Sequence, residues 1–276
     1  MDPRGVTASG ETPLGPYVAR WREQPGDGPV VLLLHGVYAG ASSYEWRRLV
    51  PALPGRRVRT PDLLGCARSD RPDLEWRPSV LTWVVDGLIR DAATAAGPPI
   101  VVASSLTGAH ALRAVAAGAP ADRLVLVTPT GLGRAQASPS GVPGRLAYAL
   151  GRHTPLGDLV VRGLSSQLSV RWFQEHQTYA DPSNLTDEEV HETRRVARLP
   201  NAKHLQLAFV TDRLGLALDP AEVEAVAPKV IWASGQGFVE PLEERRWAEA
   251  GADVTVVRDG LPHVESPDVV ASLVLA

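Results

Sequence analysis

The sequence lacks the features that mark several specialised classes of protein. It has a single cysteine, Cys66, which excludes disulfides within the chain and zinc sites built from cysteine. No apolar run approaches the ~18 residues that a membrane-spanning helix requires, and the first residues contain no apolar signal core. Lysine occurs only at positions 203 and 229, whereas arginine is abundant. We therefore expect a cytoplasmic protein without membrane contact, and the arginine usage suggests a GC-rich bacterial genome.

The chain also has little excess charge. Its formal net charge is −3 and its pI is about 6.2, so there is no basic surface of the kind that binds nucleic acid. Arg194, Arg195, Arg245 and Arg246 lie among glutamates, which is typical of solvated helix faces. With 276 residues and 44% hydrophobic content, the chain can bury the core of one large domain or of a domain with an insertion. We expect a monomer or a homodimer.

Short apolar segments alternate with helical patterns along most of the chain. Strands rich in β-branched residues are predicted over 17–21, 29–36, 56–62, 99–104, 123–129, 229–234 and 253–259. Helices are predicted over 43–53, 79–96, 106–118, 241–250 and 267–275. The N-terminal dozen residues read as a flexible arm. This alternation predicts an α/β fold with a mainly parallel central sheet and helices on both faces.

The alternation breaks once, in the segment 133–219. This segment has helical patterns but no convincing strand, and Thr186 followed by Glu189 is a capping-box signal for a helix start. An insertion of helices between two core strands is typical of a cap. We therefore divide the chain into a core, 1–132 and 220–276, and a helical cap, 133–219.

Four stretches resemble the α/β-hydrolase fold superfamily. They are "LLLHGVYAGASSYEW", "TPDLLGCARSDRP", "VVASSLTGAHAL", and "WASGQGFVEPLEERRW" followed by "DGLPHVESPDVV". The first is similar to that family's His-Gly turn and the third to its nucleophile elbow. The resemblance covers nearly all of residues 17–275 and implies the α/β-hydrolase fold with a helical cap.

The resemblance implies that Ser105 stands at the nucleophile position. Family members usually have glycines two residues before and after that serine, where this chain has Ala103 and Thr107. An inert serine at a strand end is the alternative. The family's oxyanion hole carries over to the backbone N–H groups of Val37 and Leu106, which do not depend on side-chain identity.

The other two positions of the implied Ser-acid-His triad are replaced. The acid position corresponds to Gln236, and the catalytic histidine position corresponds to Gly260. A neutral amide cannot stabilise an imidazolium as a carboxylate does. His263 corresponds to a second, structural histidine of the family, although a displaced base is the alternative reading. The nearest carboxylate, Glu240, is more simply read as a cap of the next helix.

The pocket beside Ser105 is expected to be apolar and covered by the cap. Aromatic residues there are more often core than ligand contacts, but they are the candidates for its walls. The pocket candidates are His35, Tyr38, Ser104, Trp172, Tyr179, Gln236, Phe238, Gly260 and His263. No motif predicts a cofactor, because the glycine pattern at 131–136 lacks the third glycine of a dinucleotide fingerprint, and no His-x-x-x-His pair predicts a metal.

Three functions remain open from the sequence. The first is a non-hydrolytic enzyme of specialised metabolism, in which Ser105 and the two backbone N–H groups hold a carbonyl or enolate oxygen during a cyclisation, elimination or isomerisation. The second is a serine esterase or thioesterase with a relocated relay. The third is a binding protein that has lost catalysis. In each case the expected partner is a hydrophobic small molecule rather than nucleic acid or a membrane.

Overall fold

A single eight-stranded sheet forms the centre of the molecule. The computed structural model describes residues 8–133, 141–237 and 243–276. The strand order is β1-β2-β4-β3-β5-β6-β7-β8. Strand β2 pairs antiparallel with both β1 and β4, and all other neighbouring strands pair in parallel. The strands are β1 (Ala8–Leu14), β2 (Tyr17–Gln24), β3 (Asp27–Leu34), β4 (Arg56–Pro61), β5 (Ile100–Ser104), β6 (Arg123–Val127), β7 (Lys229–Ala233) and β8 (Asp253–Val257). The predicted fold class is confirmed.

The N-terminal segment differs from the sequence prediction. Residues 8–14 form edge strand β1, paired with β2 from Ala8 opposite Glu23 to Leu14 opposite Tyr17. The expectation of a flexible arm over the first dozen residues is therefore wrong for residues 8–12, and residues 1–7 lie outside the described residues. The sequence did not predict this strand because it contains Gly10 and Pro13, and both residue types usually occur in turns rather than inside strands. Gly10 is needed here, since a Cβ at that position would meet the Trp21 ring at 2.2 Å. An edge strand also tolerates Pro13.

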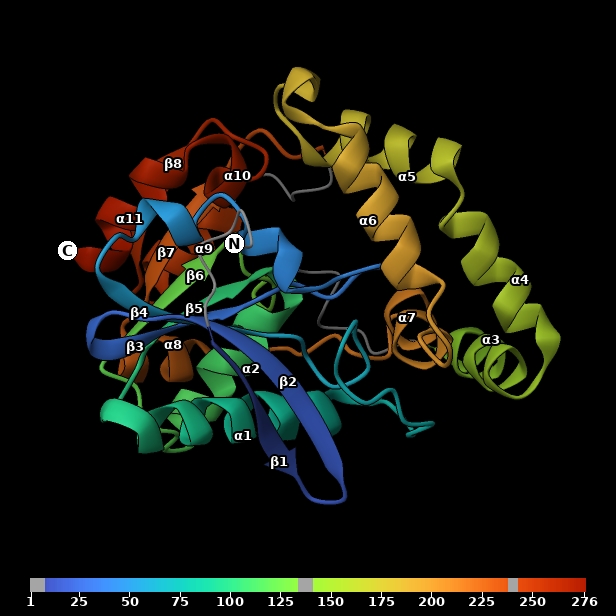
Figure 1. The fold of residues 1–276 in the computed structure, drawn as a ribbon, viewed down its shortest axis with the longest axis horizontal. Coiled ribbons are helices and arrows are strands. Elements are labelled where there is room, and N and C mark those ends of the chain that lie inside the picture. The colour runs from blue at the N-terminus through green and yellow to red at the C-terminus, as the bar shows by residue number, and fades with distance from the viewer. Residues whose placement is uncertain (1–7, 134–140, 238–242) are drawn as a thin grey trace.

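Helices cover both faces of the sheet (Figure 1). One face packs against α1 (Pro78–Ala96), α2 (Ser105–Ala116), α8 (Pro220–Val226) and α9 (Glu243–Glu249). The other face packs against η1 (Ser43–Trp46), η2 (Val50–Ala52) and α11 (Pro267–Leu275), which α10 (Pro262–Glu265) precedes. The helix predicted over 43–53 is therefore two short 3₁₀ turns, and the other predicted core helices are found with small shifts of their ends.

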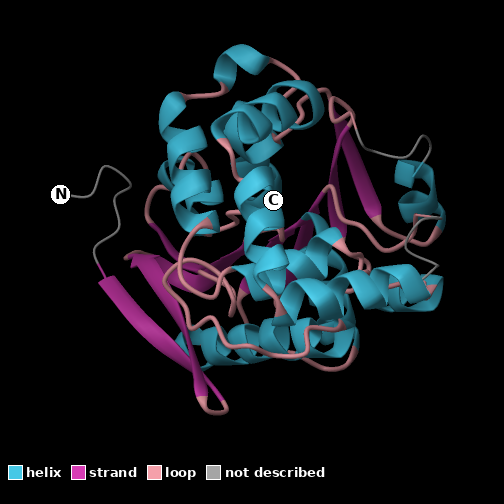
Figure 2. Cartoon of the chain, turned by 90° about the vertical axis from the view of Figure 1, so that its right-hand side faces the viewer, coloured by secondary structure: helices cyan, strands magenta, loops and turns pink. Residues whose placement is uncertain are grey.

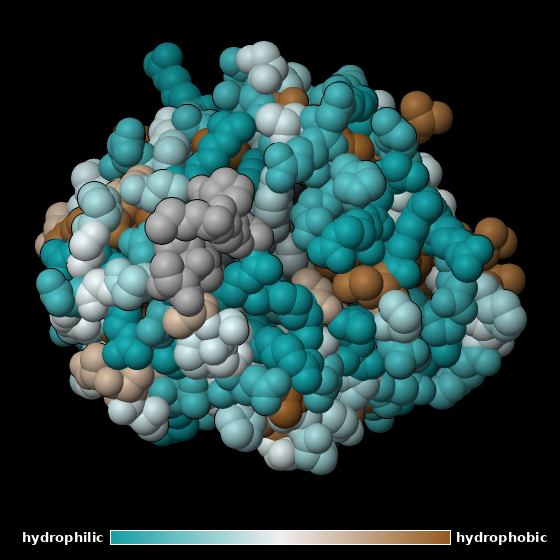
Figure 3. Space-filling view, in the orientation of Figure 1, coloured by the Kyte–Doolittle hydropathy of each residue, from teal (hydrophilic) through white to brown (hydrophobic). Residues whose placement is uncertain are grey.

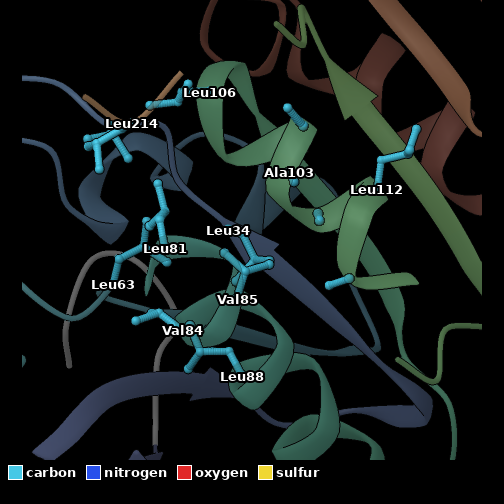
Figure 4. Packing of buried hydrophobic residues seen from close by; sticks show 14 of the residues in the cluster. Leu34, Leu63, Leu81, Val84, Val85, Leu88, Ala103, Leu106, Leu112 and Leu214 are labelled. Atoms are coloured by element: carbon cyan, nitrogen blue, oxygen red, sulfur yellow. The ribbon is translucent and has the colours of Figure 1, made fainter. Parts of the chain in front are cut away.

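Two hydrophobic clusters follow from the alternation of side chains along the buried strands. In β3, Leu32 and Leu34 point to the α1–α2 side, whereas Val31 and Leu33 point to the η1–α11 side. Leu34 belongs to the same cluster as Val85 of α1 and Leu112 of α2 (Figure 4). This packing holds the end of β5 in place, which is where the candidate site lies.

A helical segment lies between β6 and β7 and stands to one side of the sheet (Figures 1 and 2). Its elements are α3 (Val142–His153), α4 (Pro155–Leu164), α5 (Gln167–Phe173), the π-helical turn η4 (Gln174–Thr178), η5 (Pro182–Asn184), α6 (Asp187–Ala197) and α7 (Lys203–Val210). The described residues between β6 and β7 contain no strand, and the capping box of Thr186 and Glu189 is present. The limits 133 and 219 of the cap stay a prediction.

The outer surface is mostly hydrophilic on the face shown in Figure 3. Exposed apolar side chains nevertheless stand on the cap helices, for example Leu159 of α4, 69% exposed, and Leu168 of α5, 83% exposed. Within the described ranges, no helix combines the length and the apolar character that crossing a bilayer demands.

Candidate functional site

Ser105 lies on a sharp turn between β5 and α2. Its φ is +52°, a left-handed conformation that non-glycine residues rarely adopt, while Ser104 before it is still extended. The strand therefore turns into the helix within one residue. Ser105 is half-buried at this corner, as the sequence prediction of an elbow requires.

The two residues that replace the usual elbow glycines are accommodated. Thr107 is fully buried, and its Oγ1 donates a hydrogen bond of 2.7 Å to the carbonyl of His35. Ala103 is also fully buried in β5, and Gly108, one residue further along α2, packs closely against Pro129, where a Cβ would stand at 3.0 Å. Thr107 therefore ties the start of α2 to the His-Gly turn that ends β3.

His35 is a structural residue of that turn. The N–H of Leu63 donates to its Nε2 at 3.0 Å, so the proton sits on Nδ1, which donates to the Gly36 carbonyl at 2.7 Å. Burial lowers the pKa of His35 and keeps the imidazole neutral. Both ring nitrogens are thus occupied, and the ring fixes the backbone next to Val37.

The backbone groups of the predicted oxyanion hole belong to residues near Ser105. Leu106 is in the first turn of α2, where helical N–H groups have no partner within the helix. Val37 follows Gly36, whose position is so close to the elbow that a Cβ on it would lie 3.4 Å from the Ser105 Cβ. Both N–H groups thus belong to residues adjacent to the elbow or to the Gly36 turn beside it, and their role as an oxyanion hole stays a proposal.

Gln236 and Gly260, the two positions predicted to replace the acid and the histidine, contact each other. The side-chain N–H of Gln236 donates to the Gly260 carbonyl at 2.6 Å, and the Gly260 N–H donates to Glu265 Oε2 at 2.7 Å. A Cβ on Gly260 would lie 2.0 Å from the Thr178 carbonyl and 2.6 Å from the Ala180 N. Backbone from the helical segment after η4 therefore fills the space into which a side chain at position 260 would extend.

His263 is in α10 and is only 1% exposed. Its ring lies 4.7 Å from that of Trp46, centroid to centroid, and its Nε2 is 3.5 Å from Glu45 Oε1. Burial, with Arg47 nearby, lowers the pKa of His263 to about 3, so the ring is neutral. The predicted place at a helix start is correct, and the ring faces Glu45.

The remaining histidines, apart from His35, are held away from Ser105. His110 accepts from the Thr82 hydroxyl and donates to the Leu214 carbonyl, while His204 lies 3.1 Å from Asp73. His176 contacts the Trp172 carbonyl in η4. His153 and His191 are exposed on α3 and α6.

Glu45 was missed by the sequence analysis. It follows Tyr44 in η1 and is 7% exposed, with its Oε2 accepting the Gly36 N–H at 3.1 Å. The hydroxyls of Ser104 and Tyr38 lie near its carboxyl and oppose part of the rise in its pKa. Burial raises the pKa of Glu45 to about 7. The only signal in the sequence was a glutamate beside an aromatic residue in the loop after the His-Gly turn.

The aromatic residues expected around the pocket are dispersed. Tyr38 is half-buried beside Glu45, and burial raises the pKa of its hydroxyl. Tyr179 is 4% exposed, and its hydroxyl donates to Glu189 of α6. Trp172 is 56% exposed and stacks on His176. Phe238 lies outside the described residues. Contact of these residues with a ligand stays a prediction.

Two open clefts lie along the junction of the core with α6. One of about 660 Å³ is lined by Arg20, Arg68, Arg71 and Arg195, and one of about 510 Å³ by Tyr44, Arg47, Arg68 and Arg195, among others. The residues that line these two clefts do not include Ser105.

Within the described ranges, no group of three or more His, Cys, Asp or Glu side chains gathers as metal ligands would.

Comparison with known proteins assigns the family. Residues 31–273 match the model of the alpha/beta hydrolase family, and the chain belongs to that family. Solved structures agree over the whole fold. A serine hydrolase involved in carbazole degradation has a TM-score of 0.75 at 19% identity over 97% of each chain. 2-Hydroxy-6-oxo-6-phenylhexa-2,4-dienoate hydrolase from Rhodococcus sp. strain RHA1 has a TM-score of 0.73 at 22% identity over 98% of each chain.

Similarity to curated proteins is local. The magnesium-chelatase 30 kDa subunit of Rhodobacter capsulatus is 43% identical over 25% of this chain and 28% of its own length. A haloalkane dehalogenase of Mycobacterium marinum is 48% identical over 18% of this chain and 17% of its own length. The matches thus span less than a third of these relatives, and the two solved structures, at 19% and 22% identity, establish the fold alone.

Proposed function

We propose that this chain is an enzyme that binds a hydrophobic carbonyl compound at Ser105 and transforms it without hydrolysis, by isomerisation, elimination or cyclisation. One observation carries the proposal. The backbone of Thr178 and Ala180 fills the space beside Gly260, and Gln236 is bonded to the Gly260 carbonyl. Neither position offers a carboxylate or an imidazole to activate the Ser105 hydroxyl.

A serine hydroxyl is a poor nucleophile until a base accepts its proton. In hydrolases that work by this mechanism, loss of the base costs about 10⁶-fold in rate, or roughly 8 kcal/mol. One oxyanion-hole donor contributes only about 3–4 kcal/mol, so the N–H groups of Val37 and Leu106 cannot replace the base in ester hydrolysis. The same groups stabilise an enolate, whose charge also develops on a carbonyl oxygen.

Reactivity of Ser105 tests the proposal. We expect p-nitrophenyl acetate and butyrate to turn over near the buffer background, and a fluorophosphonate probe to label Ser105 slowly or not at all. Ser105→Ala serves as the control and should give the same background. Rapid labelling of Ser105, with ester turnover lost in Ser105→Ala, would instead identify a serine hydrolase with a relocated relay.

Loss of the base also fits a protein that binds a ligand without transforming it. A ligand purified with the protein and identified by mass spectrometry separates the two. Release of a chemically altered product supports the enzyme, and release of the unchanged molecule under all conditions supports a binding protein.

A further inference from the structure

Glu45 is a buried carboxyl group to which the resemblance to the alpha/beta hydrolase family assigns no role. Its side chain is 6% exposed. It has polar neighbours from three parts of the chain: the Gly36 N–H after β3, the Ser104 hydroxyl at the end of β5, and His263 of α10. Buried carboxyls are costly unless they are satisfied or serve a function.

The carboxyl is incompletely satisfied. Glu45 Oε1 has no hydrogen-bond partner among the described residues, although it lies 3.5 Å from His263 Nε2. Both ring nitrogens of His263 are likewise buried without a hydrogen-bond partner there. Oε2 of Glu45 is therefore held in place by the Gly36 N–H, while Oε1 is left to gain or lose a proton.

Glu45 lies next to the nucleophile elbow. The position that a Cβ on Gly36 would take is 3.6 Å from Glu45 Oε2, 3.4 Å from Ser104 Oγ and 3.4 Å from the Ser105 Cβ. The next backbone N–H after Gly36 is that of Val37, one of the two proposed oxyanion donors. The carboxyl thus borders the place where a carbonyl oxygen would bind.

The surroundings of Glu45 hold it near its protonation midpoint at neutral pH. Burial raises its pKa to about 7, with Ser104, Gly36, Tyr38 and Arg47 opposing part of that rise. His263 faces it as a neutral ring. Arg47 is itself paired with the carboxylate of Glu189 and donates a hydrogen bond to the Tyr179 hydroxyl, so part of its positive charge is neutralised by Glu189. A general acid or base works best when its pKa lies near the working pH.

We propose that Glu45 is the proton acceptor and donor of the site at Ser105, in place of an imidazole at position 260. The inference rests on the proposed binding of a carbonyl compound.

In the chemical step, the carboxylate takes a proton from the carbon next to the carbonyl. The transfer is direct, or it passes through the Ser104 hydroxyl, whose oxygen accepts the proton from carbon while its own proton moves to Glu45. The C–H electron pair becomes a C=C bond, and the carbonyl π pair moves onto oxygen as an enolate. When the substrate carries a C=C bond β,γ to the carbonyl, the intermediate is a dienolate. Protonated Glu45 then returns the proton to the γ-carbon, the C=C bond moves to the α,β position and the C=O bond re-forms, which completes an isomerisation. His263 acts through Glu45 and is a positioning residue.

Exchange of hydrogen for deuterium tests this proton transfer. The probe is 2-tetralone, a hydrophobic ketone, incubated with the full chain in D₂O and followed by NMR. We expect the protein to accelerate exchange at the α-carbon, with a rate that rises as Glu45 ionises around pH 7. Glu45→Gln should lose about 10²-fold or more of this acceleration. Glu45→Asp should retain part of it with a shifted pH profile, and Glu188→Gln, at an exposed glutamate of α6, should leave it unchanged.

Infrared spectroscopy provides a second readout that needs no turnover. The carbonyl stretch of a protonated carboxyl should disappear as the pH rises through about 7 in the wild type, and this titrating band should be missing in Glu45→Gln. His263→Gln should shift the midpoint of the band, whereas a merely structural histidine would not move it. Absence of a titrating band that depends on Glu45 would overturn the proposal.

The outcomes distinguish this inference from the proposed function. If calorimetry shows that 2-tetralone binds while exchange is not accelerated, or is equally fast in Glu45→Gln, then Glu45 is not the proton acceptor and carbonyl binding stands. If esters are hydrolysed efficiently and Glu45→Gln abolishes that turnover, then the non-hydrolytic function fails and Glu45 keeps its role as proton acceptor.

Discussion

Burial of Glu45 costs the folded protein free energy whenever the carboxyl is ionised. Its pKa in the folded protein is about 7, against an ordinary value of 4.5. Between these values the folded state binds more protons than the unfolded state, so stability falls as the pH rises through this window, and the loss is complete above pH 7. Converted at 1.36 kcal/mol per unit, the loss is about 3 kcal/mol.

Glu45→Gln removes this pH dependence, since the amide does not ionise. We expect the free energy of unfolding of the variant, minus that of the wild type, to be about 3 kcal/mol larger at pH 8 than at pH 4.5. Urea unfolding at the two pH values measures the difference. An effect of the same size at both would mean that the carboxyl of Glu45 does not carry a raised pKa.

At the scale of elements, the elbow depends on a bond between α2 and the turn after β3. Thr107→Val keeps the shape of the side chain but removes the hydroxyl that donates to the buried His35 carbonyl at 2.7 Å. An unsatisfied buried carbonyl costs about 1–3 kcal/mol, and we expect that loss in chemical unfolding. Thr107→Ser keeps the donor and should lose less. Equal losses for Val and Ser would assign the effect to packing instead.

The loop between β8 and α10 accepts only glycine at position 260. A Cβ there would stand 2.0 Å from the Thr178 carbonyl, which is backbone and cannot move without shifting the segment after η4. Restoring a triad with Gly260→His and Gln236→Asp is therefore not expected to produce an esterase, because the imidazole would first have to displace that segment.

Gly260→Ala isolates this contact. We expect it to destabilise the protein by several kcal/mol or to displace residues 178–180, as measured by unfolding and by hydrogen exchange of that segment. Gly163→Ala is the matched control, since nothing lies within 4 Å of a Cβ in that helix position. That control should be stabilising by about 0.5–1 kcal/mol, through helix propensity alone. A stable Gly260→Ala with unchanged exchange would contradict the close approach.

At the scale of the whole molecule, a buried ion pair joins the core to the helical segment between β6 and β7. Arg47 follows η1 and pairs with Glu189 of α6, and their side chains are 12% and 5% exposed. The Tyr179 hydroxyl bonds the same carboxylate. Removing one partner of such a pair leaves an uncompensated buried charge.

Arg47→Ala should therefore cost about 3–5 kcal/mol and loosen α6 from the core. Hydrogen exchange of residues 187–197 reports that loosening directly. Arg171→Ala is the control, because Arg171 pairs with Asp187, which is 90% exposed, and such a pair contributes about 1 kcal/mol or less. Similar exchange in both variants would mean that α6 is held by apolar contacts rather than by the ion pair.

The sequence by itself determined the features that arise from local patterns. Continuous apolar strands alternating with amphipathic helices predicted the parallel sheet, and Thr186 with Glu189 predicted the start of α6. The strand–serine–helix signal placed the elbow at Ser105. These predictions held because helix periodicity, capping and strand burial depend on residues that are near neighbours in the chain.

Only the tertiary structure decided which distant groups meet at the site. Strand β1 became visible through its pairing with β2 and the Trp21 ring over Gly10. Backbone near Thr178 closes the space beside Gly260, and Glu45 lies against Ser104 and His263. Burial and the pKa of a carboxyl are set by whatever packs around it in space, and no pattern of neighbouring residues encodes that environment.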